Sequence, residues 1–166
     1  MRLALRRSLS IVCAALALAL GACATPTSAK SPACVPQPQL GKLEPLEIVT
    51  GQGRARLMVE VADSPRERER GMMCRTAMAA DRGMLFDFKT PQPVAFWMEN
   101  TLISLDMVFI RADGRVLSIQ RNARPLDRTP LPAGGVVLGV LEIPGGRAAQ
   151  LGVLPGDQVM HRIFPK

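Results

Sequence analysis

An aromatic and polar block near the middle of the chain has the residue types of a ligand pocket. It reads Phe96-Trp97-Met98-Glu99-Asn100-Thr101, and Asp106 follows five residues later. On a strand, alternate side chains face opposite sides, so Trp97 and Thr101 would share a face. Aromatic walls beside amide, hydroxyl and carboxylate groups suit a sugar ring or an acyl chain. We therefore predict a pocket built from Arg75, Trp97, Met98, Asn100, Thr101 and Asp106.

The same residues have a structural alternative, which we favour for each of them taken singly. Asn100 and Thr101 can cap a turn, and Asp106 can accept hydrogen bonds from neighbouring backbone N–H groups. Arg75 would then pair with Asp106 or Glu142 across a sheet, and such a pair would also be structural.

Catalytic and metal chemistry have weaker support. Two carboxylates can act as general acid and base, and Asp106 with Glu142 is the pair that we would assign in a hydrolase. The chain has a single histidine, His161, which we expect to be structural. One histidine without a Cys-x-x-Cys pair argues against a structural zinc site. The methionines are expected to pack in the core rather than bind copper, so we predict no metal and no cofactor.

The amino terminus has the pattern of an export signal. Arg2, Arg6 and Arg7 precede the uncharged apolar run 9–20, which as a helix would span only ~18 Å, too short for a bilayer core. Leu20-Gly21-Ala22-Cys23 resembles the lipobox of bacterial lipoproteins, in which the cysteine is diacylated. The alternative is ordinary cleavage at Ala22-Cys23-Ala24, an A-x-A site. We expect residues 1–22 to be a signal peptide and Cys23 to carry lipid on the periplasmic side, at the outer membrane.

Composition then divides the remaining chain into a tether and one domain. Residues 23–45 are rich in Pro, Ser and Ala and are predicted to form a flexible tether. Residues 46–166 have the length of one small domain. The whole chain carries +7, the chain from residue 23 has 18 basic and 14 acidic groups (+4), and residues 46–166 have 16 and 13 (+3). Without a basic stripe, nucleic-acid binding is not expected.

Two cysteines remain once Cys13 leaves with the signal and Cys23 is lipidated. A disulfide between Cys34 and Cys74 is chemically allowed in the oxidising periplasm. It would need Cα atoms within ~7 Å, which the sequence does not show. The pairing is therefore left open.

Within the domain, strands are predicted to dominate. Ser64, Pro65 and Glu67 form a capping box that opens a helix. Asp113-Gly114 joins strands 105–111 and 115–121 into a hairpin. Other strands are predicted over 46–50, 55–62, 83–88, 94–99, 136–143 and 158–164, short helices over 77–81 and 147–151, and a long loop over 122–135. The fold class is α+β, mainly β: a small, partly closed β-barrel or sandwich with one or two short helices.

An ordered set of motifs resembles the DUF192 family, a bacterial and archaeal domain of unknown function. The set comprises Arg70-Gly71-Met72-Met73-Cys74-Arg75, Gly83-Met84-Leu85-Phe86, the segment 96–103 with Leu105-Asp106, Phe109-Ile110-x-Ala112-Asp113-Gly114, Leu141-Glu142-Ile143-Pro144 and Gly152-x-x-Pro155-Gly156-Asp157. Ser104 stands where the family usually has Pro, and Cys74 where an aromatic is common. The resemblance spans about residues 46–163. It implies a mainly β domain and supplies no reaction, cofactor or substrate.

These features together predict a lipid-anchored periplasmic accessory protein. Its single domain would bind an envelope component (a glycan, a lipid or a protein) without turnover. The alternative is a carboxylate-dependent hydrolase acting on an envelope polymer.

Overall fold

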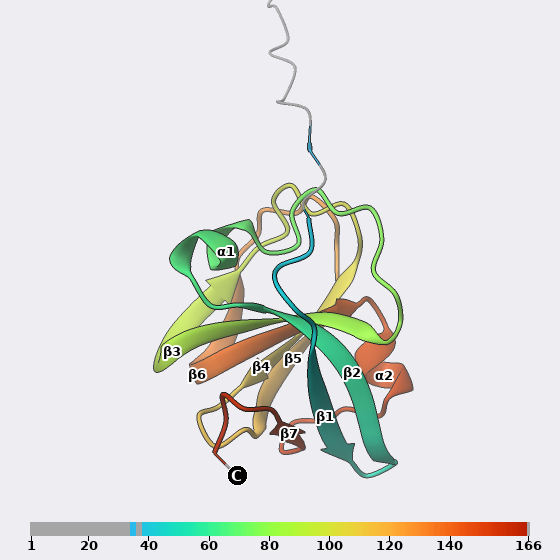
Figure 1. Cartoon of the computed structure of the whole chain (residues 1–166), viewed down its shortest axis with the longest axis vertical. Helices are drawn as coiled ribbons and strands as arrows, with labels where there is room; N and C mark the ends of the chain where they lie inside the picture. Colours follow the sequence, from blue (N-terminus) through green and yellow to red (C-terminus); the bar gives the residue numbers. More distant parts are fainter. Residues whose placement is uncertain (1–33, 36–37, 166) are drawn as a thin grey trace, which may run out of the picture. The chain divides into compact units, whose positions relative to one another are not determined.

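The computed structural model describes residues 34–35 and 38–165. The predicted signal peptide, the lipidation site Cys23 and most of the predicted tether lie outside these residues. Within the described part, seven strands form one mixed sheet that curls into a half-barrel, accompanied by two short helices (Figure 1). The mainly β fold class is therefore confirmed.

The sheet has the strand order β5-β4-β6-β3-β2-β1-β7. The strands are β1 (Glu44–Thr50), β2 (Gly53–Ala62), β3 (Arg82–Phe96), β4 (Leu105–Ile110), β5 (Val116–Ala123), β6 (Leu131–Pro144) and β7 (Gln158–Met160). The helices are α1 (Pro65–Arg70) and α2 (Arg147–Gln150). Neighbouring strands are antiparallel except β2 and β3, which are parallel and are joined by a connection that contains α1.

Local signals predicted several elements correctly. The capping box of α1 is present: Glu67 N–H donates to Ser64 Oγ, and Ser64 N–H donates to Glu67 Oε2 at 2.9 Å. The hairpin β4–β5 forms, and Gly114 takes φ +80°, which glycine adopts without steric cost. Helix α2 lies within its predicted range.

Four local predictions were wrong. The predicted strands 83–88 and 94–99 belong largely to one continuous strand, β3, which ends at Phe96. The predicted loop 122–135 is shorter, because β6 already begins at Leu131 and pairs with β3. Residues 77–81 form no helix, and β7 ends at Met160 rather than at 164. In β3 and β6, cross-strand hydrogen bonds from distant residues outweigh the local preference of proline and glycine for loops.

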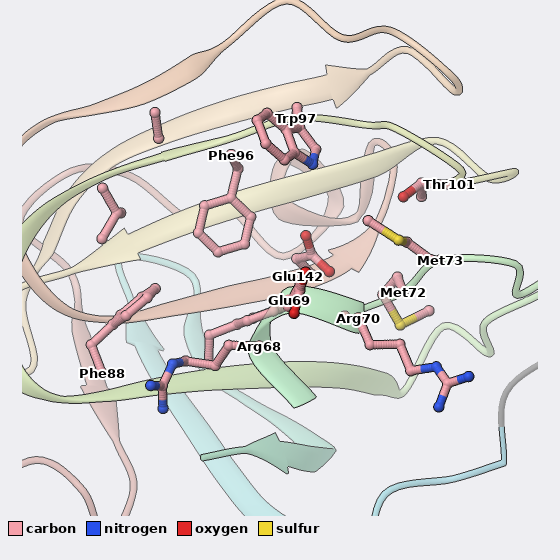
Figure 2. A pocket seen from close by; sticks show the side chains of 14 residues that line it. Arg68, Glu69, Arg70, Met72, Met73, Phe88, Phe96, Trp97, Thr101 and Glu142 are labelled. Atoms are coloured by element: carbon pink, nitrogen blue, oxygen red, sulfur yellow. The ribbon is translucent and has the colours of Figure 1, made fainter. Parts of the chain in front are cut away.

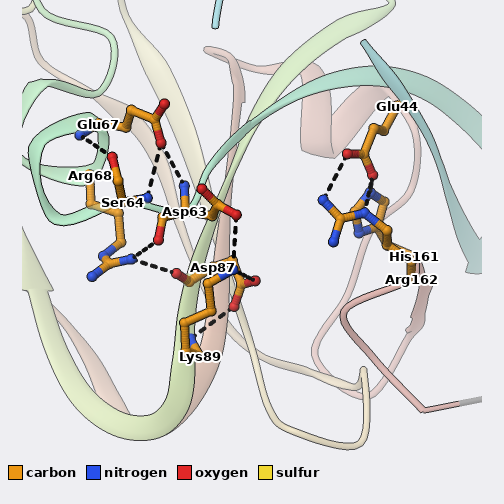
Figure 3. A network of polar contacts seen from close by, with 9 residues as sticks. All are labelled: Glu44, Asp63, Ser64, Glu67, Arg68, Asp87, Lys89, His161 and Arg162. Carbon is orange, nitrogen blue, oxygen red and sulfur yellow. Dashed lines mark hydrogen bonds and ion pairs between the residues drawn. The ribbon is translucent and has the colours of Figure 1, made fainter. Parts of the chain in front are cut away.

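A polar network holds α1 against β3 where β3 bends (Figure 3). The register between β3 and β6 shifts between Asp87 and Gln92, and Lys89 takes φ +64° there. Lys89 Nζ lies 2.9 Å from both Asp87 and Asp63. Arg68 of α1 donates to the carbonyl oxygens of Asp63, at 2.6 Å, and Asp87, at 2.9 Å. The helix and the bend of the strand are therefore joined.

The two faces of the sheet bury different side chains. One face contains Leu85, Val108 and Leu141 and is covered in part by Ala148 of α2. The other contains, among others, Met84, Phe86, Met98, Met107, Phe109 and Val140, and we call it the methionine-rich face. This alternation follows from the two-residue period of strands. It also decides on which face each carboxylate of the sheet lies.

Candidate functional site

A groove of about 380 Å³ opens on the methionine-rich face (Figure 2). One wall is formed by residues 68–73, which are the end of α1 and the segment that follows it. The other is formed by β3 on both sides of its bend and by the residues after it. Side chains that line the groove include Met72, Met73, Phe86, Phe88, Val94, Phe96, Trp97, Thr101 and Glu142. The lining is mostly apolar, as in typical small-molecule sites.

Aromatic packing builds the β3 wall. The Phe96 ring meets Phe86, Phe88 and Phe109 edge to face, with centroid distances of 5.0, 6.4 and 6.1 Å. The guanidinium of Arg68 lies 5.6 Å from the centre of the Phe88 ring. These ring contacts hold the wall in place without any contribution from a ligand.

Trp97 stands on this wall with much of its ring open to solvent. It is 53% exposed, whereas its neighbour Met98 is completely buried. Met98 N–H donates to the carbonyl oxygen of Asp127 at 2.8 Å, which holds the chain directly after Trp97. An aromatic ring that is held by its neighbours and yet exposed offers a flat apolar surface to a ligand.

Glu142 lies at the base of the groove and is only 4% exposed. It stands in register with Met84 of β3 and with Met107 of β4, so its carboxyl group projects from the methionine-rich face. Among the described residues, its Oε2 atom is buried without a hydrogen-bond partner. Burial raises the pKa of this carboxyl to about 8, although the positive charge of Arg75 acts in the opposite direction. Glu142 is therefore mostly protonated at neutral pH.

Arg75 does not pair with Asp106 or Glu142, and that prediction was wrong. Its guanidinium makes a two-pronged ion pair with Glu60 of β2, in which Nη2 and Oε2 lie 2.7 Å apart. Glu60 also accepts the backbone N–H of Leu40 at 2.5 Å. Arg75 therefore ties the segment before β1 to the sheet and does not line the groove.

Asp106 is completely buried and acts as a structural cap. Its carboxylate accepts hydrogen bonds from the backbone N–H groups of Asn122, Gly146 and Ala148, at 2.7, 3.0 and 2.8 Å. This is the structural alternative that we favoured from the sequence. The cap also fixes the start of α2.

The other predicted pocket residues are divided between the groove and the core. Trp97 and Thr101 line the groove, and the Thr101 hydroxyl donates to the Glu99 carbonyl oxygen at 3.4 Å. Met98 is core, and Asn100 occupies a turn with φ +55°. The sequence prediction therefore located one wall and missed Met72, Met73 and Phe88. The sequence did contain a signal for the residue at the bottom of the groove, because Glu142 is a lone carboxylate within an apolar strand.

The structure does not bring Asp106 and Glu142 together. Asp106 is in register with Ile143, whereas Glu142 is in register with Met107, the residue after Asp106. Successive side chains of a strand point to opposite faces, so the two carboxylates lie on opposite sides of the sheet. They cannot act on one substrate as acid and base.

A disulfide joins Cys34 to Cys74, with the Cα atoms 5.2 Å apart. Cys74 directly follows Met73 of the groove wall, and its N–H donates to the Asn100 carbonyl oxygen at 2.8 Å. The two segments that carry opposite walls of the groove thus meet beside the disulfide. The question that the sequence left open is answered in favour of pairing.

Neither helix in the described part of the chain has the length and apolar character needed to cross a membrane. The sequence pattern of the DUF192 family, described as "Uncharacterized ACR", matches residues 47–161. No curated protein matches the chain.

Two solved structures are similar to this chain. One, from Sinorhizobium meliloti 1021, is described provisionally as a transcription regulator; it is 39% identical with a TM-score of 0.73, over 77% of this chain and 99% of that one. The other, from Novosphingobium aromaticivorans DSM 12444, is described as a protein of unknown function. It is 42% identical with a TM-score of 0.72, over 82% of this chain and 99% of that one.

Proposed function

Since the chain belongs to the DUF192 family, which brings no established reaction, we propose its function from its own groove: it is a lipid-anchored protein of the bacterial cell envelope that binds an envelope glycan there without turning it over.

The observation that carries this proposal is the combination, in one groove, of an exposed Trp97 with a buried Glu142 whose Oε2 atom has no partner among the described residues. A sugar ring offers a face of C–H groups for the indole and polar groups at its rim for the carboxyl. A bare acyl chain would leave the Glu142 Oε2 atom unsatisfied, and a buried unsatisfied polar atom costs about 1–3 kcal/mol. Among a glycan, a lipid and a protein, the groove therefore favours a glycan.

Binding without turnover is favoured over hydrolysis because the assigned carboxylate pair does not exist. Asp106 is occupied by three backbone N–H groups on the face opposite Glu142. Glu142 therefore lacks the partner that the hydrolase alternative gives it, and the other carboxylate of the groove lining, Glu69, lies on the exposed surface of α1.

Export and lipidation are supported by the sequence around Cys23 and by the disulfide. Disulfides persist in oxidising compartments and are rare in the cytosol. Cys34 is bonded to the domain and lies eleven residues after Cys23, so the chain between them can span at most about 40 Å. A role in transcription, as described for the Sinorhizobium protein, does not suit an exported chain whose domain carries only +3.

Lipidation is tested with the full chain in a Gram-negative host. Wild type is expected in the membrane fraction with palmitate label, and Cys23→Ser is expected to carry no label. Cys13→Ser is the matched control, since Cys13 lies in the predicted signal peptide and its loss should leave labelling unchanged. Equal labelling of Cys23→Ser and wild type would overturn the anchor.

Glycan binding is tested on the purified full chain through its single tryptophan, which stands in the groove. Soluble muropeptides, the delipidated oligosaccharide of lipopolysaccharide and phospholipid vesicles are titrated separately. A saturable change in Trp97 emission with either glycan, and intact glycan afterwards by chromatography, is expected. No change with both glycans would refute the proposal, and shortened glycan would favour the hydrolase.

A further inference from the structure

Resting on the proposed function, we propose a narrower ligand class: the groove recognises an N-acetylated pyranose, whose acetamido oxygen accepts a hydrogen bond from the Glu142 carboxyl while its ring lies against Trp97.

The position of Glu142 requires a polar ligand atom. Its side chain leaves the sheet between Met84 and Met107, which offer no oxygen or nitrogen acceptors. Its Oε2 atom has no partner among the described residues. The groove reaches this carboxyl, so a ligand that enters it can supply the missing hydrogen bond.

The protonation state selects an acceptor on the ligand. With a pKa of about 8, Glu142 keeps its proton at pH 7 and can donate it. The carbonyl oxygen of an acetamido group is a strong, uncharged acceptor. A ligand carboxylate would have to leave water for an apolar groove, which is costly for a charged group.

The charged groups around Glu142 do not replace this donor. Arg75, which acts on it through its charge, is held by Glu60 of β2. The groove wall formed by residues 68–73 includes three charged residues of α1: Arg68, Glu69 and Arg70. A deacetylated sugar is disfavoured because it lacks the acetamido oxygen that would accept the hydrogen bond.

The remaining parts of the acetamido sugar also match the lining. The acetyl methyl group is apolar, and the walls beside Glu142 include the buried side chains Met72 and Phe86. Trp97 provides the exposed aromatic face, and Thr101 lines the same groove with a hydroxyl group. A sugar that bears only hydroxyl groups lacks the methyl group that these apolar walls would cover.

The test uses purified full-length chain and three trisaccharides: tri-N-acetylchitotriose, its deacetylated form and maltotriose. Only the acetylated trisaccharide is expected to change Trp97 emission saturably. Its affinity should fall about tenfold between pH 7 and pH 9, as Glu142 loses its proton with a pKa of about 8. Glu142→Gln keeps an N–H donor at every pH, so its binding should be independent of pH over this range. Asp81→Asn, which removes an exposed carboxylate outside the groove lining, is the matched control and should retain the wild-type pH profile.

The outcomes separate this inference from the proposed function. A response to a muropeptide or to the lipopolysaccharide oligosaccharide, without one to tri-N-acetylchitotriose, overturns the inference and leaves the function standing. Equal responses to the three trisaccharides overturn it as well. A pH-independent affinity of the wild type removes Glu142 as the donor, even if Glu142→Gln does not fold. No response to any glycan refutes both proposals.

Discussion

Glu142→Gln is expected to stabilise the protein at neutral pH, although it replaces a buried residue. Burial raises the pKa of the folded-state carboxyl from its ordinary 4.5 to about 8. The folded chain therefore holds a proton that the unfolded chain releases above about pH 4.5. Stability falls with rising pH wherever the folded state binds more protons, so the free energy of unfolding decreases between these two pKa values.

The size of this decrease in the free energy of unfolding follows from the difference between the two pKa values. Each pKa unit corresponds to about 1.4 kcal/mol. The wild type should lose roughly 3 kcal/mol by pH 7 and roughly 4 kcal/mol by pH 8, relative to pH 4. Glutamine has the same shape and does not ionise, so the stability of Glu142→Gln should not show this decrease with pH. Its advantage over the wild type should be close to zero near pH 4 and largest above pH 8.

The assay is urea unfolding of the full chain from pH 4 to pH 9, followed by circular dichroism. Glu69→Gln serves as the control, because the Glu69 side chain is exposed and lies outside the core; its effect should stay within about 0.5 kcal/mol at every pH. A difference between wild type and Glu142→Gln that does not vary with pH would refute the reasoning. It would mean that Glu142 is ionised in the folded protein, and its role as a hydrogen-bond donor would fail with it.

Three further substitutions test the assignments of individual residues. Asp106→Asn should lower the free energy of unfolding by about 3 kcal/mol, since the buried carboxylate accepts three backbone hydrogen bonds; an unchanged urea midpoint would contradict its role as a cap. Trp97→Ala should cost under about 1 kcal/mol by thermal denaturation, because the ring is 53% exposed, whereas a loss of about 3–5 kcal/mol would mark it as core. Cys34→Ser should cost up to about 4 kcal/mol, because the Cys34–Cys74 bond closes a 40-residue separation. Dithiothreitol should lower the melting temperature of the wild type alone, and an equal drop in the variant would argue against the disulfide.

Features governed by near neighbours in the chain were predictable from the sequence. The capping box at Ser64 and Glu67 depends on residues three positions apart, and the β4–β5 hairpin depends on Asp113-Gly114 and its flanking strands. The family motifs could also be recognised in the sequence, because they are short runs of residues in a fixed order. Such signals establish which elements form and which type of fold they build.

The partners of each element were decided by the tertiary structure. The prolines of β3 and the glycines of β6 read locally as loops, and only their mutual pairing makes them strands. Asp106 and Glu142 are both carboxylates on strands, and the hydrolase alternative drawn from the sequence paired them in one active site. The register of β4 with β6 places them on opposite faces, one against the start of α2 and the other at the base of the groove. Alternation along a strand fixes which residues share a face, but only packing across the sheet decides what that face meets.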